Sequence, residues 1–170
     1  MNEESNDRNW IDTLNERLAS AMAWGLLAMV ILTFVIVCLR YLFNMGWVWL
    51  QEIVLYAHAA VFLLSLAAVL RQEGHVRVDV FYRTFSQKRR NQVDGLGAFL
   101  LLVPTCAVIL YTSLPYVFDS WRVFEGSKDG GGLEAVFLLK SLIPLFSLLL
   151  MLQGIRLGWR DWQRWRKANA

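Results

Sequence analysis

Residues 18–39 read LASAMAWGLLAMVILTFVIVCL, a run of 22 residues between Arg17 and Arg40 that holds no charged side chain. A helix needs about 20 apolar residues to cross about 30 Å of hydrocarbon, because it rises about 1.5 Å per residue. This stretch therefore predicts a membrane-spanning helix. The chain starts with acidic and polar residues and lacks the basic segment that opens a signal peptide, so we expect this helix to stay in the mature protein.

Three further stretches of similar character lie at residues 47–70, 95–118 and 135–155. Hydrophobic residues make up 56% of the 170 residues and charged residues only 18%, against about 25% in soluble domains. With the first run, these stretches predict an all-α integral membrane protein of four transmembrane helices. We expect one membrane domain over residues 1–170.

Lys and Arg are divided unequally among the segments that connect these runs. Thirteen of the 17 lie in the N-terminal segment, in the loop 71–94 and in the tail 156–170. The other four lie toward the opposite side of a four-span protein. Because Lys and Arg favour the cytoplasmic side, both termini are expected to be cytoplasmic and the loop 119–134 periplasmic.

Aromatic residues also gather at the expected ends of the spans. Six tryptophans lie at these ends: Trp47, Trp49 and Trp121 on the outer side, and Trp159, Trp162 and Trp165 on the inner side. Val78, Phe81 and Phe85 are spaced i, i+3 and i+7, which predicts a short interfacial amphipathic helix. The tail alternates Trp with Arg, a pattern also found in RNA-binding proteins. Its position directly after a span instead indicates anchoring among lipid headgroups, and we expect no nucleic-acid partner.

Charged side chains within a span are costly and require a partner or a task. Glu52, Lys140 and Arg40 are expected at similar depth near the outer surface. We therefore predict that Glu52 pairs with Lys140 or with Arg40. In the alternative, Lys140 and Arg40 extend their long side chains to the outer headgroups.

The sequence indicates neither a cofactor nor a catalytic site. A haem held between helices needs two axial ligands at one depth, whereas His75 lies beyond the cytoplasmic end of the span that contains His58. His58 is expected to be a hydrogen-bonded residue inside the bundle, with a proton relay as the alternative. Cys38 and Cys106 lie in apolar runs and are expected to act as small apolar fillers. Nucleotide, zinc-protease and serine-hydrolase motifs are absent from the sequence.

Several short motifs occur in an order that is similar to a known family. They are Arg40-Tyr-Leu-Phe-Asn44, Trp47, Glu52, the segment RQEGHVRVD at 71–79, Glu125-Gly-Ser127, Lys140, Ile143-Pro144 and Gln153. Over nearly the whole chain, this order resembles the small membrane subunit (Q, or DctQ-type) of tripartite ATP-independent periplasmic (TRAP) transporters.

The resemblance implies a function in solute uptake across the bacterial inner membrane. In this family a periplasmic protein (P) captures an anionic solute, commonly a carboxylate or sugar acid, and a large M subunit moves it inward with sodium ions. The Q subunit lies against M and helps to hold it in the lipid bilayer. Sodium ions are therefore expected in the large subunit, and no cofactor is expected in this chain.

By the same resemblance, nine residues become structural or partner-interface candidates and not substrate ligands. They are Arg40, Tyr41, Trp47, Glu52, His75, Asp79, Glu125, Ser127 and Lys140. Two other classes remain as alternatives: a self-sufficient four-helix carrier that acts as a dimer, and a membrane redox subunit, which the two histidines disfavour. The solute itself is not indicated, since the other subunits select it.

Overall fold

The computed structural model describes residues 10–71 and 84–167, and the regular structure in these ranges is entirely helical. The elements are α1 (Trp10–Leu42), α2 (Val48–Arg71), α4 (Gln87–Gly97), the π-helical turn η2 (Ala98–Leu102), α5 (Val103–Arg122) and α6 (Val136–Lys167). Helix α4, η2 and α5 follow one another without a break, which makes four helices long and apolar enough to cross a membrane. The predicted all-helical, four-helix architecture is confirmed.

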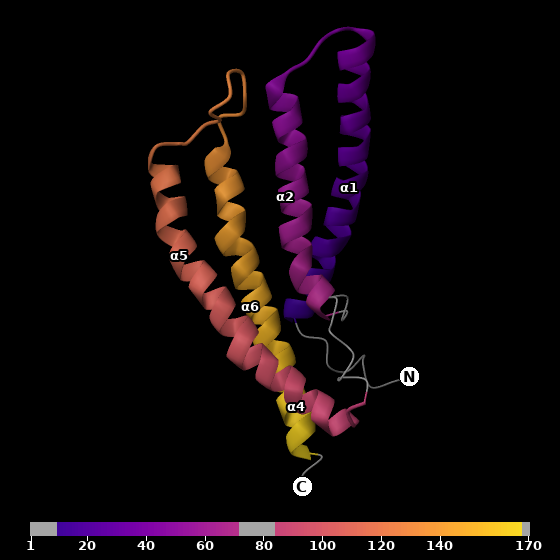
Figure 1. The fold of residues 1–170 in the computed structure, drawn as a ribbon, viewed down its shortest axis with the longest axis vertical. Helices are drawn as coiled ribbons and strands as arrows, with labels where there is room; N and C mark the ends of the chain where they lie inside the picture. Colours follow the sequence, from indigo (N-terminus) through magenta and orange to yellow (C-terminus); the bar gives the residue numbers. More distant parts are fainter. Residues whose placement is uncertain (1–9, 72–83, 168–170) are drawn as a thin grey trace.

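The helices form two antiparallel hairpins, one of α1 and α2 and one of α4–α5 and α6 (Figure 1). Helix α6 is central, because it packs against α2, α4 and α5, whereas α1 packs mainly against α2. The start of α1 and the end of α6 lie at the lower end of Figure 1. The connections 43–47 and 123–135 both lie toward the opposite, upper end of Figure 1.

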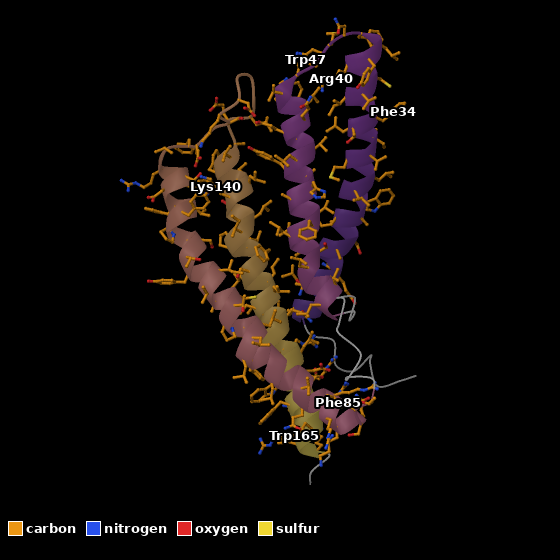
Figure 2. The ribbon with its side chains drawn as sticks, viewed as in Figure 1. Phe34, Arg40, Trp47, Phe85, Lys140 and Trp165 are labelled. Carbon is orange, nitrogen blue, oxygen red and sulfur yellow. The ribbon has the colours of Figure 1, made fainter. Side chains whose placement is uncertain are left out.

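Helix α1 packs through one narrow face. Partly covered side chains recur along its middle at intervals of three and four residues: Met22, Gly25, Met29, Leu32, Ile36 and Leu39. This spacing is the one expected of a helix that packs on a single neighbour. Residues on its other faces, such as Phe34, are exposed and project away from the other helices (Figure 2). The sequence of α1 thus suits one helical neighbour and otherwise apolar surroundings.

Two glycines allow α6 to approach the continuous helix α4–η2–α5 closely. A Cβ atom on Gly154 would lie 2.6 Å from Leu102 Cδ2, and one on Gly158 would lie 2.8 Å from the Cβ of Ala98. Both neighbours belong to η2, so the wide π-helical turn just before Pro104 packs against Gly154 and Gly158. Small residues at such spacing are a common means of helix association in lipid.

Buried polar pairs join the helices at two further points. Asn15 Nδ2 of α1 donates a hydrogen bond of 2.8 Å to Gln153 Oε1 of α6, and both residues are 0% exposed. Ser147 Oγ donates to the backbone oxygen of Cys106 over 2.6 Å. Cys106 is buried, Cys38 is half-buried, and both thiols are free. The Asn15–Gln153 contact ties the first hairpin to the second near the end opposite the connecting loops.

His58 does not lie where the sequence predicted. His58 was expected inside the bundle, but it is exposed on α2, where its ring stacks with that of Phe62 at a centroid distance of 6.5 Å. That prediction is therefore wrong.

The expected amphipathic helix of Val78, Phe81 and Phe85 lies mostly outside the described residues. Phe85, which is described, precedes the start of α4.

Candidate functional site

The loop between α5 and α6 is closed by its own backbone. The amide of Ser127 donates to the carbonyl oxygen of Leu133 over 2.9 Å, and the amide of Gly132 donates to Asp129 over 3.0 Å. Gly131 has a φ of 78°, a left-handed conformation that glycine adopts without steric cost. The glycine-rich segment thus forms a defined turn and not an open linker.

Glu52 of α2 joins this loop to the first hairpin. Its Oε1 atom accepts a hydrogen bond from the hydroxyl of Ser127, and its Oε2 atom accepts one from the backbone amide of Leu133 at 2.5 Å. Hydrogen bonds to an ionised carboxylate are stronger than those between neutral groups. The single carboxylate therefore links α2 to both ends of the turn between α5 and α6. We call Glu52, Ser127, Gly132 and Leu133 the outer joint.

Ser127 and Glu52 lie so close to position 132 that only glycine fits there without a shift. A Cβ atom at this position would lie 2.4 Å from Ser127 Oγ and 2.8 Å from Glu52 Oε1. Real Cβ atoms essentially never show contacts under 3.0 Å, so any other residue would push the hydroxyl and the carboxylate apart. The outer joint therefore depends on a glycine at 132, whereas a Cβ at the neighbouring Gly130 would meet nothing within 4 Å.

A second ionic contact lies within the other hairpin. Lys140 Nζ of α6 forms a salt bridge with Glu125 Oε2 of the loop and lies 4.0 Å from the centre of the Tyr116 ring of α5. The Lys140 ammonium holds the pKa of the Glu125 carboxyl below its ordinary value. An ammonium over an aromatic face is stabilised by the negative charge of that face. Lys140 thus ties the loop and α5 to the first turns of α6.

Aromatic side chains surround this second contact. Trp121 Nε1 donates to the hydroxyl of Ser141 over 2.8 Å. The ring of Phe137 lies edge-on to both Trp121 and Phe124, at centroid distances of 4.7 and 5.7 Å. An indole that is apolar on its faces and has one hydrogen-bond donor suits the boundary between lipid and water.

The predicted ion pair of Glu52 with Lys140 or Arg40 is wrong. Glu52 binds Ser127 and Leu133, and Lys140 binds Glu125. Equal depth in the membrane did not decide the pairing, because the loop folds between α2 and α6 and supplies closer partners to each charge. The alternative for Lys140, free extension to the headgroups, is excluded by the same salt bridge.

The structure brings four of the nine candidate residues into this region and separates the others. Glu52, Ser127, Glu125 and Lys140 lie in the two contacts described above. Arg40, Tyr41 and Trp47 are exposed at the end of the first hairpin (Figure 2), and Arg40 forms no ion pair with Glu52. His75 and Asp79 lie outside the described residues.

Three participants were not anticipated: Gly132, the backbone amide of Leu133, and Tyr116. A backbone donor leaves no trace in a sequence, whereas the run Gly130-Gly131-Gly132 is visible in the sequence and is typical of a turn. Within 10–71 and 84–167 no group of three His, Cys, Asp or Glu side chains is placed to hold a metal ion. The arrangement positions helices relative to one another and presents exposed surfaces.

Comparison with known families gives one match. Residues 29–164 match the family model described as "Tripartite ATP-independent periplasmic transporters, DctQ component". The matched range includes the outer joint, the Lys140–Glu125 contact and all of α2 and α5. No curated protein matches the chain.

Proposed function

Because the chain belongs to the DctQ component family of tripartite ATP-independent periplasmic transporters, we propose that it is the small membrane subunit that braces the large membrane subunit during sodium-driven uptake of an anionic solute. The family is one of transporter components and not of enzymes. The transported solute is proposed to be a carboxylate or sugar acid, and the site of action the bacterial inner membrane. Both termini are proposed to face the cytoplasm, in keeping with the bias of Lys and Arg.

The observation that carries this proposal is the outer joint. A brace must hold its own helices at a fixed angle while another body moves beside it. Glu52 fixes the first hairpin to the second at the outer end, and the Asn15–Gln153 contact fixes them again near the other end. Two separated attachment points resist rotation of one hairpin against the other more strongly than one point does.

Exposed apolar side chains also support the proposal that the chain is a membrane subunit. Large hydrophobic side chains are exposed along every helix, among them Phe34 on α1, Leu101 on η2 and Leu148 on α6. In a membrane protein this surface meets lipid or another subunit. Between α5 and α6, the buried hydroxyl of Ser147 is satisfied within the chain by the backbone oxygen of Cys106.

Reconstitution in liposomes tests the proposal. We expect uptake of radiolabelled carboxylates or sugar acids only when the chain, the large subunit and the periplasmic protein are present together with an inward sodium gradient. Uptake by the chain alone would instead establish the self-sufficient carrier. Uptake that is unchanged when this chain is omitted would contradict the bracing function.

A comparison of variants connects the geometry to that function. Glu52→Ala removes both acceptors of the outer joint and is expected to lower uptake by the reconstituted transporter. Glu134→Gln removes an exposed charge from the same loop and is the matched control. Equal uptake by both variants would show that the bracing function does not depend on the outer joint.

A further inference from the structure

His58 lies near the middle of α2 and points away from the other described helices. It follows Val48, the first residue of the helix, by ten positions, which is about 15 Å along the helix axis. Its side chain is exposed. Of the Asp, Glu, Lys, Arg and His side chains in the described ranges, only His58 lies near the middle of an expected span.

Two other exposed polar side chains in the spans, Thr33 and Thr112, satisfy their hydrogen bonds within their own helix. Thr33 Oγ1 donates to the carbonyl oxygen of Met29, and Thr112 Oγ1 to that of Val108, each over 2.8 Å. The described part of the chain provides no such partner for the imidazole of His58. The ring nitrogens of His58 therefore require a polar group from outside the described residues.

Lipid is a poor environment for this ring. A buried polar group without a hydrogen-bond partner is costly in hydrocarbon. Long Lys and Arg side chains relieve this cost by reaching the headgroups. The imidazole is attached through a single methylene group and does not extend about 15 Å to the surface. An exposed histidine at this depth thus indicates contact with protein.

The surface around His58 has the shape of a helix-packing face. Gln51, Leu55, His58 and Phe62 are spaced i, i+4, i+7 and i+11, and all four are exposed. We call these residues the α2 stripe. The rings of His58 and Phe62 are nearly parallel, with an interplanar angle of 9°, so the imidazole has a defined neighbour. The other faces of α2 pack against α1 and α6.

We propose that the α2 stripe is a contact surface for the large membrane subunit, and that His58 exchanges a hydrogen bond with a polar side chain or backbone carbonyl of that subunit at mid-membrane depth. This inference rests on the proposed function. A tripartite transporter of this family has a soluble periplasmic component, which does not enter hydrocarbon. The large subunit is therefore the component that reaches His58.

Photocrosslinking of the assembled complex tests the contact. The complex carries p-benzoylphenylalanine in place of Leu55 or Phe62, and in a matched control in place of Val108, an exposed residue of α5. We expect covalent adducts with the large subunit from both α2 positions. Adducts with a second copy of this chain would assign the stripe to a homodimer, and adducts with lipid alone would show that it faces the bilayer. Either result overturns the proposal.

Substitution of His58 gives an independent measurement. His58→Leu is expected to reduce the large subunit that co-purifies with the chain by about five-fold or more, the effect of one lost interhelical hydrogen bond. His58→Gln keeps a donor and an acceptor and is expected to restore much of the yield. If His58→Leu binds as well as the unchanged chain, the proposed hydrogen bond is absent.

These experiments separate the inference from the proposed function. A chain that co-purifies with the large subunit but crosslinks to it only from position 108 keeps its proposed function and loses this interface. A chain that does not bind the large subunit in any form contradicts the proposed function itself.

Discussion

Glu52 Oε2, in the second turn of α2, accepts a hydrogen bond from the backbone amide of Leu133, a residue 81 positions later in the chain, over 2.5 Å. The same carboxylate accepts a hydrogen bond from the hydroxyl of Ser127. The two bonds fix the first hairpin against the loop of the second.

Loss of the Glu52 carboxylate should release the amide of Leu133. In Glu52→Ala both acceptors are gone, so we expect hydrogen exchange at the Leu133 amide to become faster. Mass spectrometry of peptides that cover 127–135 measures this rate in detergent. Glu134→Gln is expected to leave it unchanged. If exchange at Leu133 is as slow in Glu52→Ala as in the parent, the bond does not persist in solution.

Charge reversal should distinguish the observed ion pair from the one expected from depth alone. Lys140→Glu or Glu125→Lys alone places like charges together and is expected to reduce the amount of folded protein. The double variant restores opposite charges and should recover much of that loss. Size-exclusion chromatography of fluorescently tagged protein measures it. Reversal of Glu52 and Lys140 together should give no recovery, and recovery there would favour the other pairing.

The Glu125 contact should weaken in acid. The Lys140 ammonium holds the pKa of the Glu125 carboxyl below its ordinary value of 4.5, so the contribution of this contact to stability is present at pH values above about 4.5. It is lost as the pH falls through the lowered pKa of the folded protein. We expect the Tm difference between the parent and Glu125→Gln to be constant near neutrality and to shrink below pH 4.5. A difference that is undiminished at about pH 3 would contradict this assignment.

A methyl group at position 132 should disturb the outer joint. In Gly132→Ala the added Cβ meets Ser127 and Glu52 at distances under 3.0 Å, and overpacking of this kind costs about 1–3 kcal/mol. Gly130→Ala adds the same atom where nothing lies within 4 Å and should stay within about 0.5 kcal/mol. Thermal unfolding of the two variants in one detergent makes the comparison. Equal Tm values would show that the loop relaxes without cost.

The buried Asn15–Gln153 pair should respond as a unit. Gln153→Leu leaves the amide of Asn15 without this partner and is expected to destabilise the protein by about 1–3 kcal/mol. Asn15→Leu together with Gln153→Leu removes both polar groups and should cost less than the sum of the single changes. A double-mutant cycle in chemical denaturant tests this, and strict additivity would mean that the contact contributes nothing.

The number and approximate positions of the long apolar helices could be predicted from the sequence, because a run of about 20 apolar residues without charge favours such a helix. Residues 18–39 lie inside α1, and the expected span 47–70 differs from α2 by one residue at each end. The helical tail was not predicted as helix, because α6 continues to Lys167 beyond the apolar residues that defined the span. A helix can continue past the last apolar residue of a span, because polar residues such as Arg and Gln also favour helix.

The sequence by itself determined which charges lie near the loop end of the helices, since the positions of Glu52 and Lys140 along the chain place each in the second turn of its helix. Only the tertiary structure decided their partners. A pairing depends on how each helix is rotated about its axis and on where the connecting loop folds, and neither follows from position along one helix. The backbone amide of Leu133 is a further reason, because every residue except proline carries the same donor. For His58 the sequence likewise determined its position near the middle of α2, and the packing of α2 against α1 and α6 decided that its ring faces outward.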